Sequence, residues 1–129
     1  MITNYNLKLG HKFWLEFQDD QYRNSIIGEN KIELLKKIDE TGSIQKASDE
    51  IGLDFKKAHE ILNDLQESFG DDILFTTERG RQGGTTLSMF AKLIIDVYSE
   101  IASALNPIIQ KLNDDIKSKT IDNPDFHVE

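Results

Sequence analysis

The chain has 129 residues, which is enough for one hydrophobic core and too few for two full domains. It contains no cysteine, which excludes disulfides and thiolate metal sites and favours a cytoplasmic protein. Hydrophobic residues make up 38% of the sequence, and none of their runs is long enough to span a membrane. The net charge of −8 argues against nucleic-acid binding unless the basic groups gather on one face.

Two segments near the N-terminus alternate between apolar and polar residues. The apolar positions are Tyr5, Leu7, Leu9, Phe13, Leu15 and Phe17. A period of two with β-favouring side chains predicts strands at 5–9 and 13–17. Because Gly10 and His11 between them favour a turn, we expect a small N-terminal β-hairpin that covers the core.

After Gly28 the apolar residues recur with the period of a helix. The spacing predicts a helix over 29–41, ended by Gly42 as its C-cap. Ser43 is a good N-cap for a second helix over 44–51.

A third helix follows a short turn. Gly52 ends the second helix, and Asp54 is a good N-cap for a helix over 55–69. Its apolar residues form one stripe of alternating spacings of three and four, which predicts a buried face. These residues are Phe55, Ala58, Leu62, Leu65 and Phe69.

A β-hairpin with a basic tip is predicted next. Residues 73–77 and 85–87 favour strands, and the turn 78–84 between them is rich in glycine. Residues 60–76 carry five carboxylates and no basic group, whereas 77–95 carry three basic residues against one acid. DNA binding by so acidic a chain would draw on this basic segment and would weaken quickly as salt rises.

A long helix is expected over about 88–105. A heptad seam predicts that it pairs with the same helix of a second copy. The seam residues are Ile94, Tyr98, Ile101, Leu105, Ile108 and Leu112. Asn106 and Pro107 predict a kink or a restart, after which a helix reaches about 118. The polar, acidic tail 119–129 is expected to be flexible.

The order of these elements meets the requirements of a helix-turn-helix followed by a wing. Two helices that cross closely need a small residue, which Ser48 supplies, and Gly52 allows the tight turn. The fold class is therefore mainly α with a small β content. We expect a winged helix-turn-helix domain over 1–87, a dimerisation helix over 88–118, and a flexible tail.

Several segments resemble the N-terminal winged-helix domain of the molybdate-responsive ModE regulators. They are 32–38 followed by Thr41-Gly42-Ser43-Ile44, the run Phe55-Lys56-Lys57-Ala58, the glycine-rich wing 78–84, and the leading strands. Residues 46–95 are similar to LysR-type DNA-binding domains as well. The resemblance covers about residues 5–105 and implies a homodimeric transcriptional regulator that binds double-stranded DNA.

The candidate DNA contacts combine the outward face of the third helix, its neighbourhood and the wing. They are Ser43, Lys46, Asp54, Lys56, Lys57, His59, Arg79, Arg81, Gln82 and Thr85. The sequence departs from the ModE pattern at His59, where those proteins usually carry Trp, and at Thr85, where they have a longer glycine run. Nothing in 106–129 resembles a molybdate-binding module, so we expect a stand-alone winged helix without a cofactor.

Other classes of function have weaker support. His11, His59 and His127 are far apart in sequence, which disfavours a zinc site, and no nucleophile motif indicates an enzyme. The glycines of the wing lack the Lys-Ser/Thr of a phosphate-binding loop. The remaining alternative is a winged-helix protein-interaction module without DNA binding. A continuous positive face would favour DNA, whereas a face neutralised by acids such as Asp49 and Glu60 would favour a protein partner.

Overall fold

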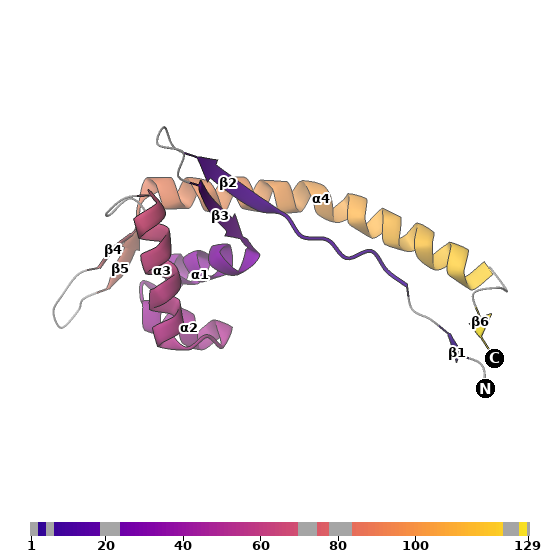
Figure 1. Cartoon of the computed structure of the whole chain (residues 1–129), viewed down its shortest axis with the longest axis horizontal. Helices are drawn as coiled ribbons and strands as arrows, with labels where there is room; N and C mark the ends of the chain where they lie inside the picture. The colour runs from indigo at the N-terminus through magenta and orange to yellow at the C-terminus, as the bar shows by residue number, and fades with distance from the viewer. Residues whose placement is uncertain are drawn as a thin grey trace. The chain divides into compact units, whose positions relative to one another are not determined.

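The computed structural model describes residues 3–4, 7–18, 24–69, 75–77, 84–122 and 127–128. The chain forms two compact units, one of residues 13–98 and one that combines 1–12 with 99–129. Helices dominate the described residues, and the strands form small antiparallel pairs (Figure 1). The prediction of a mainly helical fold with a little β-structure is confirmed.

Three helices form the body of the unit 13–98. They are α1 (Glu29–Thr41), α2 (Ile44–Ile51) and α3 (Phe55–Phe69), and their bounds agree with those predicted from the sequence. The apolar stripe of α1 is buried at Ile32, Leu34, Leu35 and Ile38, and that of α3 at Ala58, Leu62 and Leu65. Burying one large aliphatic side chain contributes roughly 1.5–3 kcal/mol, so these two stripes provide much of the driving force for folding.

The turns between these helices are fixed by their caps. Gly42 adopts φ 69°, and its N–H donates to the carbonyl oxygen of Ile38 at 2.7 Å, which ends α1. The Ser43 hydroxyl accepts the N–H of Lys46 at 3.1 Å and caps α2, as predicted. Gly52 also has a positive φ, of 70°, and ends α2.

The N-terminal hairpin contains one predicted strand, but the strand that pairs with it differs from the predicted one. Strand β2 (Trp14–Gln18) pairs antiparallel with β3 (Asn24–Gly28), with Leu15 opposite Ile27. Of the strand predicted over 5–9, residues 7–9 have no regular structure, and 5–6 lie outside the described residues. The sequence analysis missed β3 because Ile26 and Ile27 are adjacent and do not alternate with polar residues.

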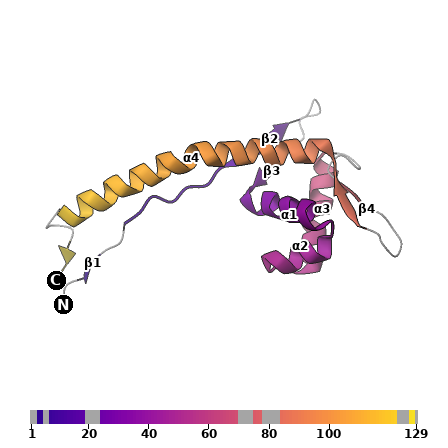
Figure 2. The same ribbon diagram turned by 180° about the vertical axis from the view of Figure 1, so that it is seen from behind.

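Aromatic rings attach this hairpin to the rest of its unit. The Phe17 ring lies 5.0 Å from the ring of Phe69 and 5.5 Å from that of Phe90, both edge-on. Phe13 stacks on Tyr98 at 4.4 Å. In Figure 1 and, from behind, in Figure 2, the pair β2–β3 lies beside the first part of α4.

The wing contacts the turn between α1 and α2. Strands β4 (Phe75–Thr77) and β5 (Thr85–Leu87) pair antiparallel, and the tip 78–83 lies outside the described residues. The N–H of Thr85 donates to the carbonyl oxygen of Gly42 at 2.8 Å. A Cβ on Gly84 would lie 2.9 Å from the same oxygen, so only glycine fits this close approach.

Helix α4 (Met89–Asp122) is continuous, which contradicts the predicted restart at Asn106 and the predicted end near 118. Pro107 removes the hydrogen bond to the carbonyl of Ser103, but both residues are exposed, so water can solvate that carbonyl. In the unit 13–98 this helix buries Ala91, Ile94 and Ile95. No helix in the described part of the chain is long and apolar enough to cross a membrane.

The other unit consists of the second part of α4 and the segments around the two termini. The N–H of Leu9 donates to Asn113 Oδ1 at 2.6 Å, and Asn113 Nδ2 donates to the carbonyl oxygen of Leu9 at 3.4 Å. Strand β1 (Thr3–Asn4) pairs with β6 (His127–Val128). The tail predicted as flexible over 119–129 therefore contains the last turn of α4 and a paired strand.

Replacing Gly84 with alanine should lower the free energy of unfolding by about 1–3 kcal/mol, the usual cost of overpacking. The reason is the 2.9 Å approach of the new Cβ to the Gly42 oxygen. Urea denaturation followed by circular dichroism measures the change. Gly10→Ala is the matched control, because a Cβ at Gly10 meets no atom within 4 Å. Equal stabilities of the two variants would contradict the close packing of the wing.

Replacing Ser43 with alanine should cost about 1 kcal/mol of stability, because the N–H of Lys46 loses its acceptor. Ser43→Asp keeps a side-chain acceptor at the same position and should retain most of the stability. Thermal unfolding of both variants beside the parent protein measures the difference. A loss of the same size in both would show that the cap is not its cause.

Candidate nucleic-acid interface

The helices α2 and α3 meet through a small buried residue and a short, hydrogen-bonded turn. Ser48 is fully buried, and its hydroxyl donates to the carbonyl oxygen of Ile44 at 2.6 Å. The carbonyl of Ser48 accepts the N–H of Leu53 at 2.8 Å, directly after Gly52. The small side chain allows the helices to approach closely. Its buried hydroxyl still has a hydrogen-bond partner, although it is removed from water. This is the helix-turn-helix geometry that the sequence predicts.

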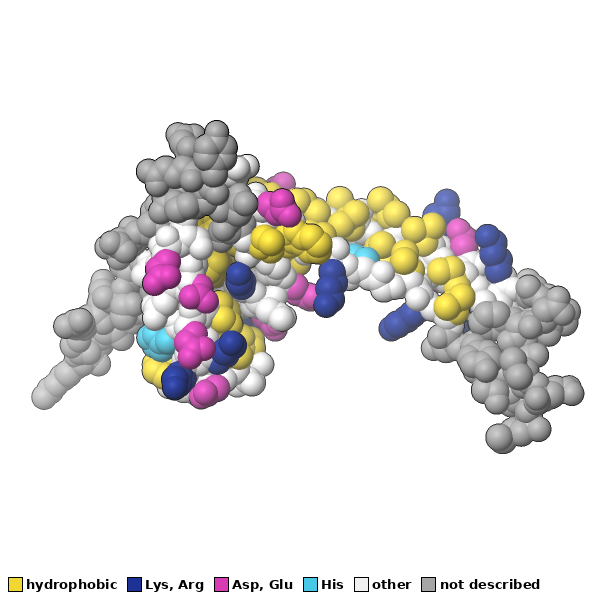
Figure 3. Space-filling view, in the orientation of Figure 1, with side chains coloured by type: hydrophobic (Ala, Val, Ile, Leu, Met, Phe, Trp, Pro, Cys, Tyr) yellow, Lys and Arg dark blue, Asp and Glu magenta, His cyan; other side chains and the backbone are white. Residues whose placement is uncertain are grey.

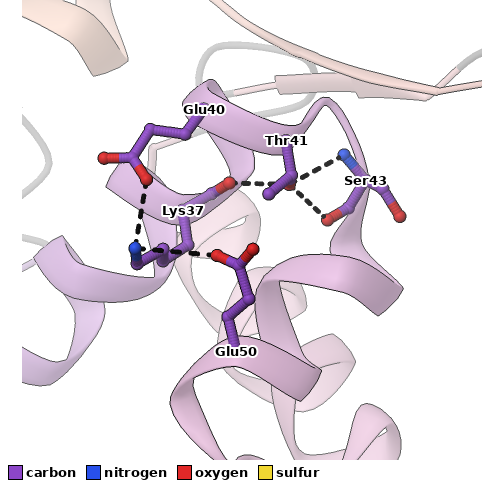
Figure 4. A network of polar contacts seen from close by, with 5 residues as sticks. All are labelled: Lys37, Glu40, Thr41, Ser43 and Glu50. Atoms are coloured by element: carbon purple, nitrogen blue, oxygen red, sulfur yellow. Dashed lines mark hydrogen bonds and ion pairs between the residues drawn. The ribbon is translucent and has the colours of Figure 1, made fainter.

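A polar network holds α1 to the start and the end of α2 (Figure 4). Lys37 Nζ lies 3.1 Å from Glu40 Oε2 on its own helix and 3.6 Å from Glu50 Oε2 on α2. The hydrogen bond and charge of Glu40, followed by the charge of Glu50, raise the pKa of Lys37. Because Lys37 is only half-buried and both carboxylates are exposed, water weakens these pairs, and they contribute more to the relative placement of the helices than to stability.

Thr41 links this network to the α1–α2 turn. Its hydroxyl lies 2.7 Å from the carbonyl oxygen of Lys37 and 3.0 Å from that of Ser43. The hydroxyl oxygen of Thr41 also accepts the N–H of Ser43 at 3.2 Å. The residue that caps α2 is therefore itself held by the last turn of α1.

The outward face of α3 and the residue before it carry four of the ten residues predicted to contact DNA. Lys56 and Lys57 are exposed, His59 is half-buried, and Asp54 is exposed directly before the helix. Lys57 Nζ lies 3.9 Å from Glu60 Oε2. The side chain of Lys56 forms no ion pair or hydrogen bond with any described residue, so its ammonium group is available to a ligand.

Phe55 does not belong to the buried stripe of α3, which corrects the prediction. Its side chain is 41% exposed, whereas Ala58, Leu62 and Leu65 are almost fully buried. The Phe55 ring meets the His59 ring edge-on, with centroids 4.4 Å apart and planes at 72°. The apolar spacing continues to the first residue of α3, but the core does not extend that far along the helix.

The charges on α2 and α3 are mixed. These helices and the turn between them contain three lysines and six carboxylates, and Figure 3 shows both kinds of side chain interspersed over this surface. Lys46 on α2 is exposed. The described part of the interface is therefore not a continuous positive face. The predicted contacts Arg79, Arg81 and Gln82 lie outside the described residues.

One predicted DNA contact does not have an accessible side chain. Thr85 is only 6% exposed, and its N–H is used by the carbonyl of Gly42. It lies at the base of the wing, where the strand packs on the α1–α2 turn. In the structure its backbone attaches the wing, and the burial of its side chain argues against its predicted contact with DNA.

The residues predicted for the dimer seam fall into two groups. Ile94 and Tyr98 are only 5% and 7% exposed, because they pack in the core of the unit 13–98. In the other unit, Ile101 and Leu105 are half-buried, whereas Ile108 and Leu112 are 55% and 43% exposed. One heptad pattern thus includes residues of an intrachain core and residues with accessible surface, which sequence spacing alone cannot distinguish.

A second exposed apolar stripe was missed in the sequence analysis. Met89, Leu93 and Val97 recur every four residues on the first part of α4 and are 81%, 57% and 38% exposed. This regular spacing of four residues is the sequence signal that could have revealed the stripe. Among the residues that the structure describes, no group of three or more histidines and carboxylates is placed to hold a metal ion.

No family model matches the sequence. The Transcriptional regulator ModE of Yersinia pestis is 30% identical over 87 residues, which cover 66% of this chain and 33% of that protein. The Molybdenum transport protein ModE of Azotobacter vinelandii is 28% identical over 93 residues, which cover 68% of this chain and 34% of that protein. The chain thus spans about a third of the length of these relatives. The similarity supports a ModE-like relationship over about two thirds of the chain.

Proposed function

We propose that this chain is a sequence-specific DNA-binding regulator of transcription that acts as a homodimer. In this proposal α3 is the recognition helix and the β4–β5 hairpin is the wing. The observation that carries the proposal is the α2–α3 corner, with Ser43 capping α2, Gly52 ending it and the exposed Lys56 on the outer face of α3. The similarity to a transcriptional regulator over 66% of the chain supports it.

The first turn of α3 is the part that would read bases. The major groove of DNA admits an α-helix, and residues near the N-terminus of a recognition helix reach base edges. Lys56 can donate to the acceptor atoms of a guanine without giving up an ion pair or hydrogen bond to any residue that the structure describes. Lys57 would first have to release Glu60, which lies 3.9 Å away. Lys56 is therefore the first candidate for a base-reading residue.

Contacts to the DNA backbone would come from cations around this turn. Lys46 at the start of α2 and the wing residues Arg79 and Arg81 are the candidates for phosphate contacts. Each phosphate neutralised by a cation releases counterions, so binding weakens as salt rises. Carboxylates on the same helix as Lys46, such as Asp49 and Glu50, would repel the phosphates and lower the affinity.

The homodimer would form through the exposed apolar residues in the second part of α4. Ile108 and Leu112 are four residues apart and therefore on one side of the helix. Ile101 and Leu105 precede them at the spacing of a coiled-coil seam. Pairing with the same helix of a second copy would remove this apolar surface from water. Two recognition helices would then read a site of twofold symmetry.

The mixed charge on α2 and α3 favours a second candidate, a protein-interaction module without DNA binding. Six carboxylates among three lysines would repel the phosphate backbone but suit a partner that presents both charges. The capped helix-turn-helix and the similarity to a transcriptional regulator make DNA the preferred ligand.

DNA binding can be measured by fluorescence anisotropy on duplexes enriched from a random pool, at two salt concentrations. We expect a palindromic sequence to be enriched and its affinity to fall at the higher salt concentration. Lys56→Ala should reduce discrimination between bases by about 1–3 kcal/mol. Arg81→Ala should weaken all sequences alike. Lys36→Ala, which removes an exposed charge from α1, is the control.

Two outcomes would contradict these expectations. Equal losses on all sequences for Lys56→Ala would exclude Lys56 as a reader of bases. Failure of the parent protein to bind any duplex at low salt would reject DNA binding and favour the interaction module.

Ile108→Glu should convert the dimer into a monomer, because it places a charge in the proposed apolar interface. Sedimentation velocity over a range of protein concentrations measures the change. Ser103→Glu is the matched control, since it adds the same charge at an exposed position on the opposite side of α4. A dimer that persists in Ile108→Glu, or dissociates equally in both variants, would place the interface elsewhere.

A further inference from the structure

We infer that Phe55 determines specificity by contacting the 5-methyl group of a thymine in the major groove. The inference rests on the proposed function, because it assigns a base to one residue of the proposed recognition helix. It adds an apolar reader to a surface for which only polar and charged contacts were predicted.

The position of Phe55 is not explained by the hydrophobic core. It is the first residue of α3, and 41% of its side chain is exposed. The partly buried residues that pack against the core include Phe69 at the other end of the same helix, but not Phe55. Because 41% of the side chain is exposed, part of its apolar surface is available to a ligand.

The ring of Phe55 is held by a neighbour on the same helix. His59 lies one turn later, and the two rings meet edge-on with centroids 4.4 Å apart. His59 is half-buried, which restricts the motion of its own side chain. A ring fixed in this way loses less conformational entropy on binding than a free side chain. The contact with His59 therefore pre-organises an apolar edge, the Phe55 ring, at the start of α3.

The side chains around this edge are polar. Lys56 follows directly, and Asn63 is exposed two turns along the helix. Both can donate hydrogen bonds to base edges, and asparagine commonly pairs with adenine. Phe55 is the member of this surface that can neither donate nor accept a hydrogen bond through its side chain.

The chemistry of the groove then limits what Phe55 can contact. The major-groove edges of the four bases present hydrogen-bond donors and acceptors, and the one apolar group is the methyl group of thymine. A phenyl ring placed on a polar edge would remove water from it without replacing the hydrogen bond, which is unfavourable. A ring placed on the methyl group removes apolar surface from water on both sides. Thymine is therefore the base that fits Phe55.

Replacement of thymine by deoxyuridine tests this directly, because it removes the methyl group and leaves the base-pairing groups in place. The probe is the duplex enriched by the parent protein from a random pool, with each thymine replaced in turn. At one position in each half-site we expect the parent protein to bind about fourfold more weakly, the change expected for one methyl group. Anisotropy titrations measure this for the full chain.

The variants separate a methyl contact from a structural effect. Phe55→Ala should bind the thymine and deoxyuridine duplexes equally, whereas Phe55→Leu should keep a preference for thymine because leucine also offers apolar surface. Trp14→Ala is the matched control, since Trp14 is an aromatic residue of the hairpin β2–β3 and is 51% exposed. It should retain the full sensitivity to the methyl group.

Three results would overturn the inference. The first is binding of the parent protein that does not change at any deoxyuridine position. The second is the same methyl sensitivity in Phe55→Ala and in the parent protein. The third is a random pool from which no sequence is enriched, since the protein then reads no bases. If the parent protein binds no duplex at all, the proposed function fails as well. In the first two results the parent protein still binds DNA, so only the inference fails.

Discussion

The peptide groups of Gly42 connect the three parts on which the proposed interface depends. Its N–H ends α1 on the carbonyl of Ile38, and its own carbonyl accepts the N–H of Thr85 at the base of the wing. The left-handed conformation of Gly42, with φ 69°, turns the chain so that Ser43 can cap α2 directly afterwards. One residue therefore sets the end of one helix, the start of the next and the attachment of the hairpin.

This junction explains why small residues face each other across it. The carbonyl of Gly42 is available to the wing because no side chain lies on Gly84, the residue opposite. The network of Thr41 and Lys37 holds the same turn from the side of α1. Because α3 follows α2 through a hydrogen-bonded turn, the position of the outward face of α3 relative to the wing derives from these contacts. Specific recognition needs such rigid placement, since a reader of bases must lie within hydrogen-bond distance of its target.

The sequence predicted the helices and caps of this domain well, because each of them depends on local chemistry. The stripe around Ile38, the cap at Ser43 and the turn at Gly52 are visible in a few consecutive residues. Strand β3 was missed because its pairing with β2 depends on a partner distant in sequence. Of the kink or restart expected at Asn106 and Pro107, the restart was wrong, because a proline on an exposed side of a helix costs one hydrogen bond, and water can replace it.

The assignments to the site were harder to predict, for a different physical reason. Whether Ile94 packs inside the chain or pairs with a second copy depends on how far the core extends along α4, and both outcomes produce the same heptad spacing. Phe55 continues the spacing of the α3 stripe but lies beyond the end of the core. Thr85 is polar and lies near a basic turn, yet its burial follows from the hydrogen bond between its backbone and Gly42. In each case the outcome depends on how far the core and the distant parts of the chain extend to that residue, which its local spacing does not show.

The charge pattern of α3 determines which kind of DNA contact the proposed function can use. The helix carries two lysines and three carboxylates, and one of the lysines lies 3.9 Å from Glu60. Contacts between cations and phosphates provide most of the affinity for arbitrary DNA, so a surface of this composition binds non-specific sites weakly. Selectivity depends on the ratio between specific and non-specific affinity, which rises when the non-specific part is small. Base contacts at the first turn of α3, rather than total charge, would then account for recognition by an acidic chain.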